Sequence, residues 1–166
     1  MSSLKEILVL GYYATEEINP FISEISPLYP EVKIRYLQEY TRLGTAGGIY
    51  HFRDQIKAGN PSCFILINGD VSGDFPLEEM LQFHARKQQG GFVPLLTVLG
   101  TEATRQQSSN YGCVVENRET HKITHYVEKP ETFVSTLINC GVYICGLELF
   151  DIIGKIFKKR QTAYYA

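Results

Sequence analysis

The sequence predicts an α/β protein with a mostly parallel sheet that helices cover on both faces. Short apolar runs alternate with longer stretches of helical periodicity along the 166 residues. The apolar runs are mostly continuous rather than alternating, which is typical of strands buried on both faces. Ligands gather at the carboxyl ends of the strands in such sheets. Polar residues that directly follow an apolar run are therefore the candidate site residues.

The first predicted elements are a strand, a helix and a second strand. A four-residue apolar run predicts a strand over residues 7–10. Asn19 followed by Pro20 predicts a helix start, because Asn caps free N–H groups and Pro suits the first helical position. This helix is expected to end before Pro27. Apolar and polar residues then alternate over residues 32–40, which predicts a strand.

The rest of the chain continues the alternation of helices and strands. Apolar residues at helical spacing predict a helix over residues 49–56. A second continuous apolar run predicts a strand over residues 64–67, and Pro76 opens the next helix. The remaining expected elements are a strand over residues 92–99, a hairpin over 112–129, a strand over 139–144 and a helix over 147–157.

Composition limits the classes of function. The 16 Lys+Arg and 18 Asp+Glu residues give a net charge of −2, so no basic excess exists to drive counterion release on nucleic acid. No apolar stretch approaches the ~20 residues that span a bilayer, and Glu6 makes the N-terminus a poor signal peptide. The four cysteines lie in or beside apolar runs and form no CxxC pair, which indicates reduced thiols. We expect a soluble, cytoplasmic protein that binds neither nucleic acid nor membranes.

Two segments that follow predicted strands could bind a nucleotide and a metal. The glycines of LGTAGG, residues 43–48, let backbone N–H groups approach a phosphate or the edge of a base, although a tight strand-to-helix turn is the alternative. Asp70, in Asn-Gly-Asp, follows the strand over residues 64–67, where a carboxylate can hold Mg²⁺ against phosphates. A single Asp is not a metal site, and Asp74 is better explained as a helix cap.

Three later segments could bind a sugar phosphate. Glu128 can accept hydrogen bonds from sugar hydroxyls and Lys129 can neutralise a phosphate, with a solvated charge pair before a turn as the alternative. In INCG, residues 138–141, an amide enters a strand and the glycine leaves room for a ligand, although a β-bulge would use the same residues. NYG, residues 110–112, allows the same two interpretations.

In this order, LGTAGG, NGD, NYG, VEKP and INCG resemble the sugar-phosphate nucleotidyltransferases, and most of all the mannose-1-phosphate guanylyltransferase (GDP-mannose pyrophosphorylase) family. The runs RYLQEYTRLGTAGGIYHFRDQI, NYGCVVEN and HYVEKP are closer to its alpha, regulatory-type subunit than to its catalytic beta type. The resemblance implies a Rossmann-like nucleotidyltransferase fold. Residues 1–160 would form a partial domain, and residues 161–166 an atypical tail.

The resemblance also implies a reaction and its ligands. Mannose-1-phosphate would attack the α-phosphorus of GTP, which gives GDP-mannose and pyrophosphate. Asp70 would hold Mg²⁺ beside the phosphates, and Lys129 would bind the sugar phosphate. The base would lie along Gln38, Gly44, Thr45 and Gly47, and the mannose would contact Gly112, Glu128 and Asn139. The implied partner is a catalytic beta-type subunit in a hetero-oligomer.

Three features of the family have no match in this sequence. The family opens with a strand and a glycine-rich signature, roughly GGxGTRLRPLT, which wraps the triphosphate and supplies a catalytic Arg. A second metal-binding Asp and a C-terminal left-handed β-helix are also unmatched. We therefore expect a chain truncated at both ends, without the first strand and phosphate loop, and catalytically silent alone. Loss of that strand should leave two neighbouring strands unpaired or paired anew.

Other functions remain alternatives to a silent fragment. One is a regulatory module that binds GDP-mannose or a partner subunit without catalysis. A subunit of the translation-factor exchange complexes that share this fold fits less well, because such a subunit does not need Glu128, Lys129 and Asn139 together. Metal-dependent glycosyltransferases are more distant, because they carry DxD where this chain has NGD.

Overall fold

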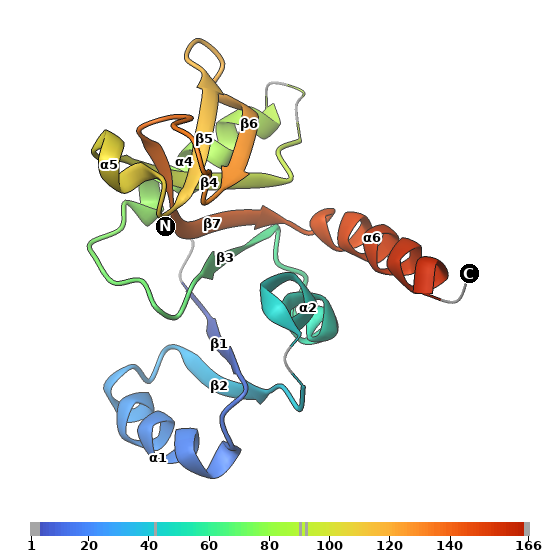
Figure 1. The fold of residues 1–166 in the computed structure, drawn as a ribbon. Helices are drawn as coiled ribbons and strands as arrows, with labels where there is room; N and C mark the ends of the chain where they lie inside the picture. The colour runs from blue at the N-terminus through green and yellow to red at the C-terminus, as the bar shows by residue number, and fades with distance from the viewer. Residues whose placement is uncertain (1–3, 42, 90, 92, 165–166) are drawn as a thin grey trace. The chain divides into compact units, whose positions relative to one another are not determined.

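The computed structural model describes residues 4–41, 43–89, 91 and 93–164, and its secondary structure follows the expected alternation of strands and helices (Figure 1). The chain divides into two compact units. The first contains residues 1–61 and 150–166, and the second contains residues 62–149. Among the described residues, β1 and β2 form the sheet of the first unit and β3 to β7 form the sheet of the second.

The first unit is built around a strand–helix–strand segment. It contains β1 (Glu6–Gly11), α1 (Thr15–Ile25), the 3-10 turn η1 (Ser26–Leu28), β2 (Lys33–Gln38), α2 (Gly44–His51), α3 (Arg53–Ile56) and nearly all of α6 (Leu149–Tyr164). β1 and β2 pair in parallel, as expected for an α/β fold. Across this pair, the Arg35 guanidinium lies 2.7 Å from a Glu6 carboxylate oxygen.

The start of α1 differs from the prediction. The helix begins at Thr15, so Pro20 lies inside it, and the predicted start at Asn19 is wrong. The side-chain carbonyl of Gln38 accepts hydrogen bonds from the Thr15 backbone N–H at 3.3 Å and from its hydroxyl at 2.7 Å. A partner in β2 therefore satisfies one N–H of the helix terminus, and the Glu17 carboxylate accepts locally from the Ala14 backbone N–H at 3.3 Å. The helix does end before Pro27, where η1 follows.

The glycine-rich segment forms the start of α2. The helix begins at Gly44, whose φ of +67° suits glycine. Gly47 is buried, and a Cβ added there would lie 3.6 Å from the ring of Phe157 in α6. The Tyr50 ring stacks on the Phe157 ring with the centroids 5.3 Å apart. The predicted continuous helix is divided at Phe52, which separates α2 from α3.

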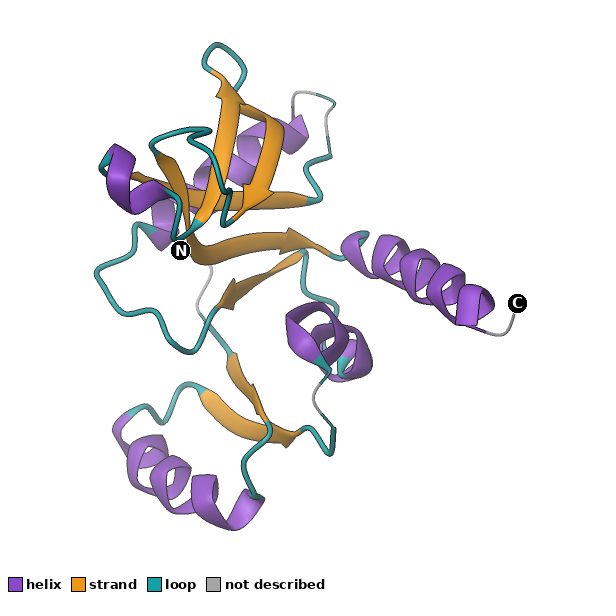
Figure 2. Ribbon diagram, viewed as in Figure 1, coloured by secondary structure: helices purple, strands orange, loops and turns teal. Residues whose placement is uncertain are grey.

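β7 pairs with three other strands in the second unit. The unit contains β3 (Cys63–Ile67), α4 (Leu77–Gln89), β4 (Leu96–Glu102), α5 (Arg105–Ser108), β5 (Gly112–Asn117), β6 (Lys122–Glu128) and β7 (Leu137–Gly146). β7 pairs with β3, β4 and β5, and β6 pairs with β5 (Figure 2). All of these described pairings are antiparallel.

The expected mostly parallel sheet therefore holds for β1 and β2 but not for the second sheet. β3 and β4 point in the same direction, because each is antiparallel to β7. They are not neighbours, since β7 lies between them. A continuous apolar run indicates that a strand is buried on both faces, but it does not indicate the direction of the strand. The sequence pattern therefore could not distinguish a parallel from an antiparallel sheet.

The core of the second unit lies between α4 and the sheet. Met80 of α4 packs against Val142 and Ile144 of β7, and both β7 side chains are completely buried. β4 begins two residues after Pro94, because proline has no N–H to donate to a neighbouring strand. Phe92, at the start of the strand predicted over residues 92–99, lies outside the described residues. The predicted hairpin is confirmed as β5 and β6.

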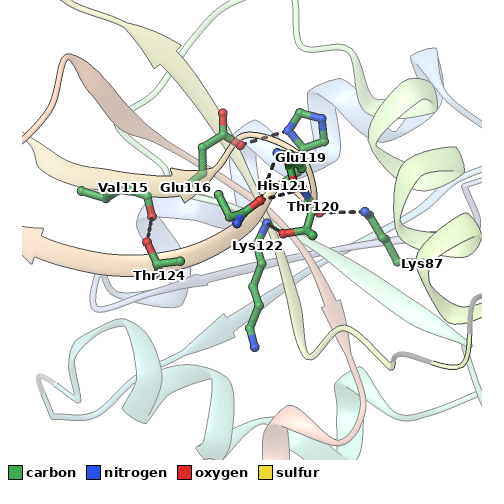
Figure 3. Close-up of polar contacts among 9 residues, drawn as sticks. Lys87, Val115, Glu116, Glu119, Thr120, His121, Lys122 and Thr124 are labelled. Carbon is green, nitrogen blue, oxygen red and sulfur yellow. Dashed lines mark hydrogen bonds and ion pairs between the residues drawn. The ribbon is translucent and has the colours of Figure 1, made fainter.

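The turn of this hairpin is attached to α4 (Figure 3). The side-chain oxygen of Asn117 accepts hydrogen bonds from the backbone N–H groups of Glu119 and Thr120, both at 3.0 Å. The Lys87 ammonium, from α4, donates to the Thr120 carbonyl at 2.8 Å. The turn is thus closed by a local side chain and also bonded to the helix, while β6 itself pairs with β5.

The cysteines are free thiols, and Cys113 and Cys145 are buried. Burial raises the pKa of Cys145 to about 12, so this thiol stays protonated at neutral pH and is a poor nucleophile. Among the helices that the structure describes, none combines the length and the apolar character required to cross a bilayer.

Acidification should destabilise the second unit through His84. Burial lowers the pKa of His84, against a smaller opposing effect of Glu148. In the unfolded chain the pKa of a histidine is about 6.5, so below that pH the unfolded state binds more protons than the folded state. The free energy of unfolding should therefore fall as the pH drops below about 6.5.

Urea unfolding of wild type and His84→Gln between pH 7.5 and 5.5 checks this expectation. The variant should show a shallower loss of unfolding free energy, whereas His125→Gln, at an exposed position, should keep the wild-type slope. Equal slopes for wild type and His84→Gln would contradict the role of His84.

Candidate functional site

A chain of hydrogen bonds joins β6 to β7. The Tyr126 hydroxyl donates to Glu128 Oε2 at 2.6 Å. Asn139 Nδ2 donates to the hydroxyls of Tyr126, at 3.3 Å, and Tyr143, at 2.7 Å. Asn139 Oδ1 accepts from the Gly141 N–H at 2.9 Å. A tyrosine therefore connects Glu128 and Asn139, two of the residues predicted to contact a sugar.

Gly112 provides the space for this connection. It lies opposite Glu128 in the register of β5 and β6 and is buried. A Cβ at Gly112 would overlap the Tyr126 hydroxyl and lie 2.8 Å from Glu128 Oε2. The structure thus brings Gly112, Glu128 and Asn139 together, and the Tyr126 and Glu128 side chains occupy the space that a side chain at position 112 would take.

The local structure of β6 explains why Tyr126 and Glu128 meet. Side chains two residues apart in a strand lie on the same face. Partial burial raises the pKa of Tyr126, and the hydrogen bond to Glu128 raises it further. The hydroxyl is therefore protonated at neutral pH and can donate to the carboxylate. Sequence reasoning missed Tyr126 and Tyr143, although the two-residue spacing from Glu128 could have identified the first of them.

Lys129 follows this network at the end of β6. Its φ of +44° lies in the left-handed region, so the chain leaves the strand direction at this residue. The Lys129 backbone N–H donates to the Tyr111 carbonyl at 3.2 Å, which links VEKP to NYG. The side chain is exposed, and within the described part of the chain it forms no salt bridge. This ammonium group can therefore meet an anionic ligand.

The turn that carries Asp70 lies against the β7 segment that carries Asn139. The Asn68 N–H donates to the Gly141 carbonyl at 2.9 Å. Gly141 has a φ of +73°, and the register of β4 with β7 shifts beside it, so this segment is a β-bulge. A Cβ at Gly141 would lie 2.8 Å from Asn68 Nδ2, which shows how closely the two segments approach.

Asp70 itself is exposed. Among the described residues, no group of three or more His, Cys, Asp or Glu side chains is arranged to hold a metal ion. Mg²⁺ in nucleotide sites is nevertheless often held by only one or two carboxylates together with water and substrate phosphates. An exposed carboxylate at the end of β3 fits that pattern.

The residues predicted to lie along a base belong to the first unit. The Gln38 side-chain carbonyl is engaged by Thr15, so its amide NH₂ group is what it could offer to a base. The next residue, Glu39, reaches α2, because a Cβ at Gly48 would overlap its carboxylate. Of the predicted residues in α2, Gly44 and Thr45 are exposed and Gly47 is buried.

Comparisons with known proteins agree with this architecture. Residues 1–164 match the Nucleotidyl transferase family. The mannose-1-phosphate guanylyltransferase regulatory subunit alpha of Drosophila melanogaster is 49% identical over 99% of this chain. The regulatory subunit alpha-A of Danio rerio is 51% identical over 97% of it. The chain spans 37% of the length of each of these relatives.

A solved structure supports the fold. The crystal structure of apo UDP-glucose pyrophosphorylase superposes with a TM-score of 0.65 at 19% sequence identity, covering 91% of this chain and 63% of that chain. The expected Rossmann-like nucleotidyltransferase fold is thus confirmed, as is the resemblance to the alpha-type subunits. The chain belongs to the nucleotidyl transferase family, and within it to the relatives of the mannose-1-phosphate guanylyltransferase alpha subunits.

Proposed function

We propose that this chain is a nucleotidyltransferase-like domain of GDP-mannose biosynthesis that is inactive alone and binds GDP-mannose as a regulatory module. The observation that carries this proposal is the Glu128–Tyr126–Asn139 network beside Gly112. A carboxylate and hydroxyl groups held at one place suit a ligand rich in hydroxyls, as a hexose is. The names of the relatives, which are regulatory alpha subunits, favour a regulatory role.

Lys129 is proposed to bind the phosphate next to the sugar. Its exposed ammonium directly follows Glu128 in the chain, where a sugar phosphate would present its charge. A lysine ammonium is a compact point charge that neutralises phosphate without fixing one geometry. Lys129 and Glu128 together would therefore recognise the two chemically different ends of mannose-1-phosphate, or of the same group within GDP-mannose.

Gln38, Gly44, Thr45 and Gly47 are proposed to lie along the guanine base of GTP or GDP-mannose. The exposed first turn of α2 supports this assignment, because free N–H groups at a helix start can meet polar acceptors on a ligand. The amide NH₂ of Gln38 can likewise donate to a base carbonyl.

Asp70 is proposed to hold Mg²⁺ against the phosphates. Its exposed carboxylate provides an oxygen ligand of the kind that Mg²⁺ prefers. When bound, the ion would neutralise negative charge on the phosphate oxygens. The residues of the chain would then contribute positioning and charge neutralisation, rather than covalent chemistry.

The proposed partner is a catalytic beta-type subunit. Regulatory subunits act on a partner, and the relatives of this chain are named as regulatory subunits. The first unit also exposes large apolar side chains, among them Tyr13, Phe21 and Leu28. Exposed apolar residues of this kind are what a subunit interface covers.

The chain alone should not synthesise GDP-mannose. No segment of its 166 residues matches the glycine-rich signature that supplies the catalytic Arg in the family. Incubation with GTP, mannose-1-phosphate and Mg²⁺, followed by chromatography of the nucleotides, should show no product above a protein-free blank. A catalytically active family member serves as the positive control. Robust, Mg²⁺-dependent turnover by the chain alone would overturn its assignment as inactive.

Replacement of Lys129 by Ala should weaken GDP-mannose binding in calorimetric titration. Loss of a charged hydrogen bond to phosphate predicts about a tenfold or larger rise in Kd. Lys155→Ala, which removes an exposed charge from α6, is the matched control and should bind as wild type does. If Lys129→Ala binds GDP-mannose as tightly as wild type, Lys129 has no phosphate role.

A further inference from the structure

The Asn139 amide is occupied by the protein's own groups. Its two Nδ2 protons are donated to the hydroxyls of Tyr126 and Tyr143, and its Oδ1 accepts from the Gly141 N–H. An amide NH₂ group has only two protons to donate. Without a ligand, Asn139 therefore orders the two tyrosines.

The Tyr126 hydroxyl connects this network to Glu128. A carboxylate only accepts hydrogen bonds, so the single hydroxyl proton of Tyr126 goes to Glu128 Oε2 at 2.6 Å. The Tyr126 hydroxyl oxygen in turn accepts from Asn139 Nδ2 at 3.3 Å. The missing side chain at Gly112 leaves the space in which the Tyr126 hydroxyl and the Glu128 carboxylate meet.

One oxygen of the Glu128 carboxylate remains for a ligand. Oε2 receives the Tyr126 proton, and within the described residues no hydrogen-bond partner is found for Oε1. Glu128 is exposed, so without the tyrosine its side chain would sample several rotamers in water. The hydrogen bond from Tyr126 limits this freedom before any ligand binds.

We propose that Tyr126 is a positioning residue of the sugar site: its hydroxyl holds Glu128 so that Oε1 accepts a hydrogen bond from a sugar hydroxyl. This inference rests on the proposed binding of GDP-mannose. Loss of the Tyr126 hydroxyl leaves the aromatic ring in place and removes the constraint on Glu128. Part of the binding free energy must then be used to order the Glu128 side chain.

The test compares Tyr126→Phe with wild type in titrations with GDP-mannose and with GDP. The variant should bind GDP-mannose about five- to tenfold more weakly, because binding must then order the Glu128 side chain, and should bind GDP unchanged. A purely structural defect would weaken both ligands, so the difference between them is the informative readout. Tyr29→Phe, at an exposed position in the first unit, is the matched control and should change neither affinity.

A double-mutant cycle with Glu128→Ala tests whether Tyr126 acts through Glu128. If it does, Tyr126→Phe adds little to the loss already caused by Glu128→Ala. Fully additive losses would overturn the positioning role. Gly112→Ala provides a second variant, because its methyl group displaces the Tyr126 hydroxyl, and it should show the same selective loss.

The outcomes separate this inference from the proposed function. Wild-type protein that binds GDP-mannose no more tightly than GDP would overturn the proposed sugar site, and the positioning role with it. A wild-type preference for GDP-mannose that survives Tyr126→Phe would overturn the positioning role alone. Equal losses for GDP and GDP-mannose in Tyr126→Phe would also overturn it.

Discussion

The backbone hydrogen bonds of β7 determine most of the second unit. On one edge β7 pairs with β3 and, nearer its start, with β5, and on the other edge it pairs with β4. Ile144, which lies opposite Ile65 on one side and Thr97 on the other, is completely buried. Because neighbouring strands hold β7 on both edges, the strand can contain the bulge at Gly141 and still keep a fixed position.

The same strand carries the core on one face and the polar network on the other. Val142 and Ile144 pack against α4, whereas Tyr143, the residue between them, bonds to Asn139. The positions of the polar side chains are therefore set by the packing of their apolar neighbours. A cavity in the core of the second unit would therefore displace the polar network through the backbone of β7.

The sequence pattern identified features that depend on residues close together in the chain and missed contacts between residues far apart in it. Continuous apolar runs predicted β1 and β3, and the motifs NYG, VEKP and INCG contained Gly112, Glu128 and Asn139. The hydrogen bonds of Thr15 at the start of α1 could not be predicted, because their partner is Gln38, 23 residues further along the chain. Strand direction and the bond from Asn139 to Tyr126 were missed for the same reason, since each depends on which strands become neighbours in space.

The exposed oxygen of Glu128 has a consequence for selectivity among sugars. A hydroxyl that replaces the water at Oε1 exchanges one hydrogen bond for another at little cost. A deoxy sugar without that hydroxyl would remove the water and leave a charged oxygen without a donor, which costs more than the contact itself is worth. Within the proposed function, a carboxylate that is already ordered in the free protein thus disfavours a deoxy sugar more strongly than it favours the sugar that carries the hydroxyl.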